Sequence, residues 1–486
     1  MNSPLRKVAV AALVLFGLLF LNVNYLQFVR ADTLRENPNN RRVQFERYGR
    51  ARGKILAGDK EIVTNVKTKG QYKYQRKYVD GPLYAGITGY YSLYFGRTGV
   101  ERAYDQILSG EDDSLFVRRV SDLVTGREPE GAAVRLTIRG DLQQLAAKLL
   151  GDRRGAVVAL DPKTGAILTL LSSPTYDPEL ISSVSPKTAQ AGYDKALSTP
   201  GRPLVNKASA DRFPPGSIFK VITAAAYFDQ LHKTPADLVA SPKTLPLPLT
   251  VKDVLTNFGN ASCGADKITV ERALEISCNT AFANMGLEVG GEALRATAEG
   301  FGFNEPYDNL PFQTVASRFP GGINAPQTAQ SAIGQFDVAA TPLQMAVVAA
   351  GIANGGVPMR PYVVDSVITP DLHVIDRTLP QTLRSQPAVS PQTAIYLNQM
   401  MQTVVRSGSG VRAQIPGVSV AGKTGTAQNA EGKAPHAWFI GFAPAEDPQV
   451  AVAVVVEDGG DAGSEATGGR VAAPIAKAVM RAVLGR

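Results

Sequence analysis

Apolar runs typical of buried β-strands lie at both ends of the larger part of the chain, with helical sequence between them. The runs are Ala156–Leu160, Ala166–Leu171, Val418–Gly422, Ala437–Phe442 and Val450–Glu457. The first two flank a turn that has Pro162 and Gly165 where a hairpin needs them. Ala-rich sequence from residue 217 to about residue 353 predicts helices, and another helix is expected at residues 473–484. We therefore expect an α+β domain whose sheet is assembled from distant segments.

An apolar segment near the N-terminus predicts a transmembrane helix. Val8–Leu21 contains no polar side chain, and the apolar character continues to Val29. About 22 helical residues at roughly 1.5 Å each reach roughly 33 Å, enough to cross a bilayer. A cleaved signal peptide with a cleavage site at Ala31 is the alternative, but an uncleaved anchor is favoured. Long domains cross membranes largely regardless of flanking charge, so residues 31–486 are expected outside the cytoplasm.

A chain of 486 residues is long enough for two or three domains. Residues 1–30 are the predicted cytoplasmic tip and transmembrane anchor. Residues 31–150 are polar, basic and rich in Tyr and Gly, and short alternating runs at 60–67 and 72–79 predict small strands in a mixed, non-catalytic module. Residues 151–486 form the larger domain.

The excess of positive charge does not indicate nucleic-acid binding. The formal net charge is +8 and the sequence pI is about 9.3, and the surplus falls on residues 31–100, next to the membrane segment. No aromatic-rich basic motif or zinc-finger spacing accompanies it. Attraction to an anionic lipid or polymer, or an ordinary solvated surface, is the expected use.

The two cysteines, Cys263 and Cys278, lack the spacing of a metal site, so neither a metal nor another cofactor is expected. In an oxidising compartment they can form a disulfide worth on the order of 3 kcal/mol for a loop of this length. Two independent buried thiols are the alternative, and the sequence leaves both open.

The first of three short motifs is Ser217-Ile218-Phe219-Lys220, which follows a Pro-Pro-Gly turn. Residues i and i+3 share a helix face, so the Lys220 amine can approach the Ser217 hydroxyl, while N–H groups at the helix start can polarise a carbonyl oxygen. Serine is a poor nucleophile until a base takes its proton, and a lysine whose pKa is lowered from about 10.4 can be that base. Alone, the pattern is more often a solvated helix start.

The second motif is Ser277-Cys278-Asn279. A hydroxyl here can relay a proton between lysine and leaving group, and the amide can bind a substrate amide and hold Lys220 in place. An isolated motif of this kind is more often a helix cap or a polar turn.

The third motif, Lys423-Thr424-Gly425-Thr426, is expected on a strand that begins near Val418. On a strand Thr424 and Thr426 point to the same face, and Gly425 permits close approach of another backbone. Lys423 adds positive charge for a substrate carboxylate. The alternative is an edge strand that ends in a turn.

Together, the order and separation of these motifs resemble those of penicillin-binding proteins and serine β-lactamases. The chain is most similar to class B penicillin-binding proteins of the compact actinobacterial A type. The similarity covers nearly the whole chain and is weakest at about residues 60–130. It includes Ala51–Ile55, Gly155–Ser172, Ser331–Gln335, Thr341–Met345, Ala353–Gly356 and Gly468–Arg470, and in the weak region Arg97, Gly99 and Glu101.

The resemblance implies a peptidoglycan D,D-transpeptidase of the cytoplasmic membrane, working in division or elongation, with a five-stranded antiparallel sheet flanked by helices and no glycosyltransferase activity. By carry-over, Ser217 attacks the penultimate D-Ala carbonyl of a stem pentapeptide on a lipid-linked precursor. A neighbouring stem's amine then takes the acyl group. β-Lactams would acylate the same serine, and a membrane glycosyltransferase of the SEDS type is the expected partner of the N-terminal module.

The same resemblance implies the roles of the remaining motif residues. Lys220 would be the acylation base, Ser277 the proton relay and Asn279 the group that binds the donor amide. Thr424 and Thr426 would hold the terminal carboxylate, with the N–H groups of Ser217 and Thr426 as the oxyanion hole.

Some residues depart from the family pattern or leave a choice open. Cys278 is unusual at the centre of its motif, and a bond to Cys263 would tether a catalytic loop. The segment that begins with Glu305 resembles the loop carrying the deacylation glutamate of class A β-lactamases, against the alternative of a polar turn. His436 and Trp438 either line the cleft or are, by default, a surface histidine and a packed aromatic.

Three other functions compete with transpeptidation. A D,D-carboxypeptidase would pass the acyl group to water, but the N-terminal module and the class B pattern disfavour it. The anchor and the chain length disfavour a β-lactamase. An idle scaffold or sensor that only binds muropeptide or drug is disfavoured by the intact Ser217, Lys220, Asn279 and Lys423.

Overall fold

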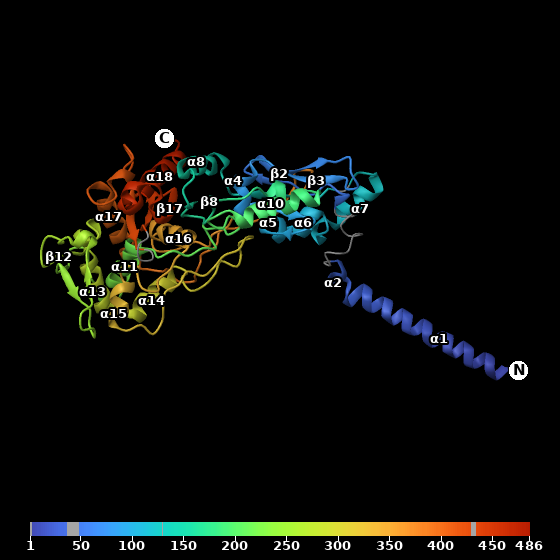
Figure 1. Cartoon of the computed structure of the whole chain (residues 1–486), viewed down its shortest axis with the longest axis horizontal. Helices are drawn as coiled ribbons and strands as arrows, with labels where there is room; N and C mark the ends of the chain where they lie inside the picture. The colour runs from blue at the N-terminus through green and yellow to red at the C-terminus, as the bar shows by residue number, and fades with distance from the viewer. Residues whose placement is uncertain (1, 36–47, 129, 429–433) are drawn as a thin grey trace.

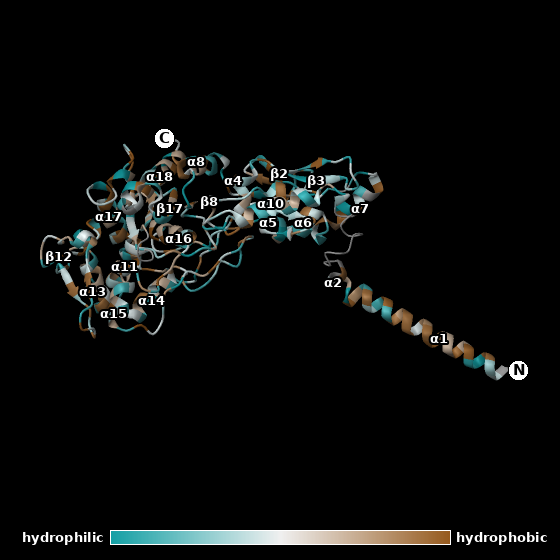
Figure 2. Cartoon of the chain, viewed as in Figure 1, coloured by the Kyte–Doolittle hydropathy of each residue, from teal (hydrophilic) through white to brown (hydrophobic). Residues whose placement is uncertain are grey.

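The computed structural model describes residues 2–35, 48–128, 130–428 and 434–486 (Figure 1). An N-terminal apolar helix, α1 (Asn2–Asn24), continues through the short π-helix η1 (Tyr25–Val29) and is followed by α2 (Ala31–Arg35). The helix at residues 3–29 contains an 18-residue stretch with a mean hydropathy of 2.1, and by length and composition this helix can cross a membrane. Apolar residues run along it (Figure 2), at the position of the expected span.

The next module is built on a six-stranded sheet with the order β14-β13-β6-β1-β2-β3. Its strands are β1 (Ile55–Ala57), β2 (Lys60–Lys67), β3 (Tyr74–Tyr78), β6 (Ala133–Leu136), β13 (Val364–Ile368) and β14 (Val374–Arg377). The strands expected at residues 60–67 and 72–79 are thus present as β2 and β3. The sequence analysis missed β13 and β14, which return from the larger domain to complete the sheet beside β6.

Short helices and one small hairpin cover this sheet. They are α4 (Gly81–Thr88), α5 (Gly99–Ala103), α6 (Asp105–Ser109), α7 (Phe116–Thr125), β4 (Tyr91–Ser92) and β5 (Gly96–Arg97).

A buried ion cluster lies inside the module. The fully buried Glu101 carboxylate accepts hydrogen bonds of 2.7 Å from both Arg52 Nε and Arg76 Nε. Burial raises the pKa of Glu101, but the charges of Arg76 and Arg52 outweigh burial and hold that pKa below its ordinary value. The Arg52 guanidinium also contacts Asp105 at 2.9 Å. Arg52 and Glu101, which contribute to the sequence resemblance, therefore hold the module together.

The larger domain has a five-stranded sheet with the order β15-β16-β17-β7-β8, and every neighbouring pair is antiparallel. Its strands are β7 (Gly155–Leu160), β8 (Ile167–Ser173), β15 (Ala421–Ala427), β16 (His436–Ala443) and β17 (Val450–Val456). The expectation of one sheet joining distant segments is confirmed. Strand β15 begins after Val418 because Ile415 and Val418 pair across the Pro416-Gly417 turn.

Helices cover both faces of this sheet, which explains its continuous apolar runs. On one face Val157 belongs to a buried cluster with Val479 of α18, and on the other Val158 belongs to a cluster with Val347 of α16. The helices of this domain that contact its strands are α8 (Gly140–Leu150), α16 (Pro342–Ala353), α17 (Pro391–Arg406) and α18 (Gly468–Val483). The other helices of this domain are α11 (Lys220–Leu231), α12 (Val270–Glu275), α13 (Asn279–Val289), α14 (Gly291–Gly300) and α15 (Ala325–Ser331). Helix α9 (Pro178–Ile181) contacts β3 and β4 of the N-terminal module, and α10 (Pro186–Ser198) packs on α9.

The helical region between the strands also contains two small two-stranded antiparallel sheets that the Ala-rich pattern concealed. They are formed by β10 (Thr244–Pro246) with β11 (Val254–Thr256), and by β9 (Leu238–Ala240) with β12 (Lys267–Thr269). Helix α18 begins at Gly468, earlier than expected, because the Thr467 side chain accepts a hydrogen bond from Arg470 N and caps it.

Two glycines allow close packing where β15 meets its neighbours. A Cβ on Gly425 would lie 3.0 Å from Pro215 O and from Ile218 Cγ2, so this strand lies directly against the Ser217 turn. A Cβ on Gly468 would lie 2.0 Å from Trp438 O and 2.5 Å from Gly425 O. The start of α18 therefore presses β15 from the other side.

We predict that Gly468→Ala destabilises the larger domain by about 3 kcal/mol, because its methyl group collides with backbone atoms that cannot move independently. Chemical denaturation followed by near-UV circular dichroism measures this effect. Gly70→Ala is the matched control, because the nearest atom to its Cβ would be Thr68 Oγ1 at 3.9 Å. Equal unfolding midpoints for the two variants would contradict the prediction.

Candidate active site

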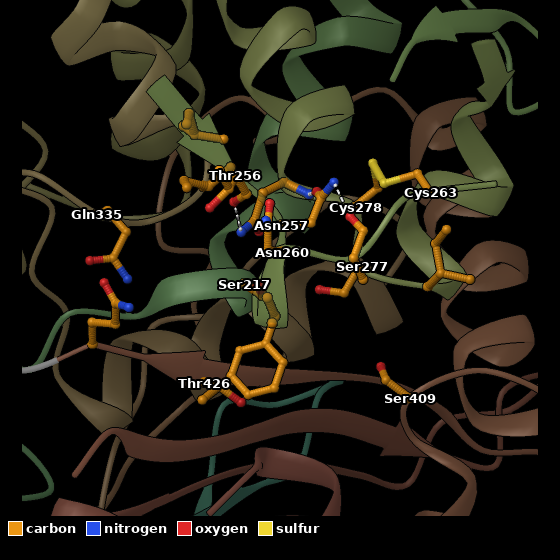
Figure 3. Close-up of a pocket in the computed structure, with 18 of the residues that line it drawn as sticks. Ser217, Thr256, Asn257, Asn260, Cys263, Ser277, Cys278, Gln335, Ser409 and Thr426 are labelled. Atoms are coloured by element: carbon orange, nitrogen blue, oxygen red, sulfur yellow. Dashed lines mark hydrogen bonds between the residues drawn. A yellow bond between two sulfur atoms is a disulfide. The ribbon is translucent and has the colours of Figure 1, made fainter. Parts of the chain in front are cut away.

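A cleft of about 1100 Å³ opens beside the end of β15. Ser217, Ser277, Asn279, Thr424 and Thr426 all line it, although they come from segments far apart in sequence. Figure 3 shows Ser217 near the centre, with Ser277 to one side and Thr426 below. The structure therefore brings the three sequence motifs to one place.

Ser217 lies on the 3₁₀ turn η3 (Gly216–Phe219), and α11 begins only at Lys220. The sequence analysis expected both residues on one helix. The tight turn is held by the hydrogen bond of 3.0 Å from Gly216 N to Gly334 O, a residue of the Ser331–Gln335 segment. The Ser217 side chain is partly exposed to the cleft, whereas Lys220 is fully buried behind it.

Lys220 Nζ donates to three oxygens of the second motif. They are Ser277 O at 2.7 Å, Asn279 Oδ1 at 2.7 Å and Ser277 Oγ at 3.3 Å. Burial, with a smaller contribution from the positive charge of Lys423, lowers the pKa of Lys220 well below its ordinary value. A lysine in this state gives up its proton readily, as a general base must.

Lys423 approaches Ser277 from the sheet side. Its Nζ donates to Ser277 Oγ at 2.8 Å and to Thr424 O at 2.9 Å. Burial lowers the pKa of Lys423 to about 7. Lys423 is fully buried and lies behind the wall of the cleft, and its charge is nearest to the Ser277 hydroxyl.

Ser277 therefore stands between two buried lysines. It occupies the break between α12 and α13, with a positive φ of 62° that non-glycine residues rarely adopt. The next residue, Cys278, forms a disulfide with Cys263. This bond ties the Ser277 break to the segment at residues 254–264, which also lines the cleft (Figure 3).

Thr424 and Thr426 share one face of β15, as alternation on a strand requires, and both reach the cleft. The Thr424 hydroxyl forms a hydrogen bond of 2.6 Å with Ser409 Oγ. Ser409 follows α17 and its backbone N donates to Glu275 O. The two threonines present hydroxyl groups suited to a carboxylate.

Two functional positions escaped the sequence analysis. Asn257 Oδ1 accepts hydrogen bonds from the backbone N of Asn279 at 2.7 Å and of Thr280 at 3.2 Å, and so fixes the start of α13. Ser409 holds Thr424. Both residues lie in loops without any periodic pattern, and only the folded chain brings them to the motifs.

The structure also places the residues whose role was open. Glu305 is exposed, pairs with Arg384 at 3.0 Å and is absent from the cleft lining. Trp438 is the packed aromatic of the default expectation, with its Nε1 donating to Pro214 O at 3.1 Å. The expectation of a surface His436 is wrong: it is buried, and its Nδ1 accepts from Asp458 N.

Family models match most of the chain. The penicillin binding protein transpeptidase domain matches residues 155–481, and the penicillin binding protein A dimerisation domain matches residues 52–134.

Similar proteins cover the chain from end to end. The peptidoglycan D,D-transpeptidase PbpA of Mycolicibacterium smegmatis is 44% identical over 100% of this chain and 99% of its own length. The protein of the same name from Mycobacterium tuberculosis is 43% identical over the same shares. The ceftriaxone acyl-enzyme complex of M. tuberculosis penicillin-binding protein A superposes with a TM-score of 0.87, at 42% identity, covering 90% of this chain and 100% of that one. Its penicillin G acyl-enzyme complex gives a TM-score of 0.84, at 43% identity and the same coverage.

The chain belongs to the penicillin-binding protein transpeptidase family, in class B. Within that class it is of the penicillin-binding protein A type, and its activity is that of a peptidoglycan D,D-transpeptidase.

We predict that the double variant Cys263→Ala/Cys278→Ala loses about 3 kcal/mol of folding stability, because the unfolded chain gains the freedom that the closed loop removes. Urea unfolding of the variant and of the parent measures the loss. Addition of a reductant is the control: it should destabilise the parent and leave the variant unchanged. A parent that does not respond to the reductant and unfolds with the variant would contradict the prediction.

Proposed function

We propose that this chain catalyses cross-linking with Ser217 as the nucleophile and Lys220 as its base. The observation that carries the proposal is the convergence of Lys220 and Lys423 on the Ser277 hydroxyl, next to the cleft that Ser217 lines. Two positive charges buried around one hydroxyl repel each other, which favours the neutral form of the Lys220 amine. A neutral amine can accept the Ser217 proton.

In the first half-reaction, Ser217 Oγ attacks the penultimate D-Ala carbonyl of a stem pentapeptide while Lys220 takes its proton. The C–N bond to the terminal D-Ala then breaks, and the proton passes through Ser277 to the leaving amine. In the second half-reaction a neighbouring stem's amine attacks the acyl-serine, gives up a proton by the same route and releases Ser217.

The remaining motif residues bind and polarise the substrate in this proposal. Thr424 and Thr426 hold the terminal carboxylate, and Lys423 supplies positive charge behind them. Asn279 binds the donor amide. The backbone N–H groups of Ser217 and Thr426 form the oxyanion hole, whose donors are each worth roughly 3 to 4 kcal/mol in the transition state.

We also propose the organisation in which this chemistry takes place. Residues 1–30 anchor the chain in the cytoplasmic membrane by one span, and residues 31–150 form most of a non-catalytic module, whose sheet is completed by β13 and β14. The rest of residues 151–486 forms the transpeptidase domain outside the cytoplasm. The apolar helix at residues 3–29 and the two family matches support this division. β-Lactams acylate Ser217, in keeping with the acyl-enzyme complexes of the similar M. tuberculosis protein. A SEDS-type glycosyltransferase is the proposed partner, by family resemblance alone.

Mass spectrometry of the full chain with benzylpenicillin tests the nucleophile. We expect one stable adduct in the parent and none in Ser217→Ala. Glu305→Gln is the matched control and should acylate normally, because this side chain is exposed and outside the cleft lining. An adduct that persists in Ser217→Ala would refute the assignment. Release of D-Ala without cross-linked product, when donor and acceptor stems are supplied, would make the enzyme a carboxypeptidase.

The acylation rate is predicted to depend on pH in the neutral range. Acylation needs a neutral Lys220, so its rate rises as pH rises through the lowered pKa of this amine. Carboxylate binding needs a charged Lys423, so the rate falls again above a pH of about 7, where this amine loses its proton. Stopped-flow acylation by benzylpenicillin between pH 5 and 10 measures the profile. Lys423→Arg keeps its charge and should move the falling limb to higher pH; a parent profile that rises steadily towards pH 10 would contradict the assignment.

A further inference from the structure

Helix α7 of the N-terminal module is turned with its apolar side outward. Phe116, Val117, Val120 and Val124 have exposures of 59%, 79%, 45% and 81%. These positions recur at helical spacing and form one face. A helix on a soluble module normally buries such a face, so this one is built to meet something outside the module.

The polar side of α7 faces the module instead. Arg118 Nη1 donates to Asp371 at 2.8 Å, and the Arg118 guanidinium also pairs with Asp122, which is buried. Arg119 donates to Gly110 O at 3.2 Å. These contacts fix the rotation of α7 about its axis. Its apolar side is therefore held in an exposed position.

A further apolar side chain, on a neighbouring hairpin, is exposed at the same end of the module. Asp371 lies at the tip of the hairpin between β13 and β14, and the next residue, Leu372, is 82% exposed with a φ of 66°. The pairing of Ile368 with Ala133 puts this tip at the start of β6. Polar residues normally occupy such turns, so Leu372 extends the apolar surface of α7 onto the neighbouring hairpin.

The chain enters the module from α1 at this same end. Ala51 pairs with Glu130, just before β6 and shortly after α7. The opposite end of β6 leads to the larger domain. Figure 1 accordingly shows α7 on the side of the module that faces α1 and α2, with the larger domain on the far side.

Lysine and arginine side chains lie near the C-terminal end of α7, whereas the exposed acidic residues Glu111 and Asp113 precede its N-terminal end. The β2–β3 hairpin reaches the end of α7, where Lys73 pairs with Glu128 at 2.6 Å. Lys67, Lys69 and Arg127 are exposed nearby. The hydrogen bonds from Lys73 and Tyr74 lower the pKa of Glu128, and the charge of Lys67 makes a smaller contribution in the same direction. Exposed apolar residues flanked on one side by Lys and Arg are suited to a surface that lies on anionic lipid.

We propose that this end of the module docks on the lipid bilayer that holds α1. The docking surface consists of Phe116, Val117, Val120, Val124 and Leu372, which enter the headgroup region, and of Lys67, Lys69 and Arg127, which contact anionic headgroups. The proposal rests on the proposed anchor and goes beyond it. With the α1 anchor alone, the height of the cleft above the membrane and the tilt of the cleft would not be fixed. Two contacts with one membrane fix both.

The test uses the full chain in lipid nanodiscs loaded with one copy each. Phe116→Trp places an indole in the docking surface, and lipids brominated near the headgroups quench indoles that reach them. The single native tryptophan, Trp438, is fully buried and supplies a constant background. Val251→Trp is the matched control, because Val251 is 96% exposed and belongs to the larger domain. Benzylpenicillin acylation of each variant verifies its fold.

We expect brominated lipid to remove at least half of the added fluorescence of Phe116→Trp and almost none of that of Val251→Trp. Raising anionic lipid from none to about a third of the total should increase the quenching, and Lys67→Glu/Lys69→Glu should cancel that increase. Equal quenching of the two tryptophan variants would overturn the proposal. The proposal would also be overturned if the indole of Phe116→Trp were shielded only when two copies share a disc, because a second chain would then cover α7. A chain that does not enter discs at all would refute the anchor itself, a result distinct from a chain that enters but is not quenched.

Discussion

The arrangement of the active site depends on two buried ammonium groups that share one hydroxyl. Burying a lysine is costly unless oxygens satisfy its donors, and here Lys220 and Lys423 find those oxygens on the same short break between α12 and α13. Three segments remote in sequence must meet for either lysine to be satisfied. Burial lowers the pKa values of both lysines, and the positive charge of Lys423 lowers that of Lys220 further, while the hydrogen bonds to these oxygens make the burial tolerable.

Much of the larger domain was predictable because its strands are buried on both faces. Such strands are apolar at nearly every position, and the runs at residues 156–160, 437–442 and 450–456 stand out for that reason. The opposite holds for β14, whose four residues are all exposed and carry no buried pattern. Its membership of the N-terminal sheet depends on pairing with β13, a long-range contact that local sequence does not encode.

The sequence predicted which residue types belong to the site and the order of their motifs, but it did not predict how these residues are arranged in space. The pattern Ser217 to Lys220 suggested two neighbours on one helix, whereas a 3₁₀ turn separates the serine from the helix that starts at the lysine. Lys423 was expected to add positive charge for a substrate carboxylate, and its contact with the Ser277 hydroxyl was not foreseen. Asn257 was missed because a single loop asparagine has no signature until its carboxamide meets the start of α13.

The return of β13 and β14 to the N-terminal sheet also bears on the order in which the chain can fold. A ribosome releases residues in sequence, and one edge of β6 stays unpaired until residue 368, the end of β13, has emerged. The N-terminal module therefore cannot complete its sheet on its own, because β13 and β14 are synthesised only after most helices of the larger domain. A recombination that exchanges this module between related enzymes must therefore include residues 364–377. Without them the edge of β6 stays exposed, and strands of other chains can pair with it.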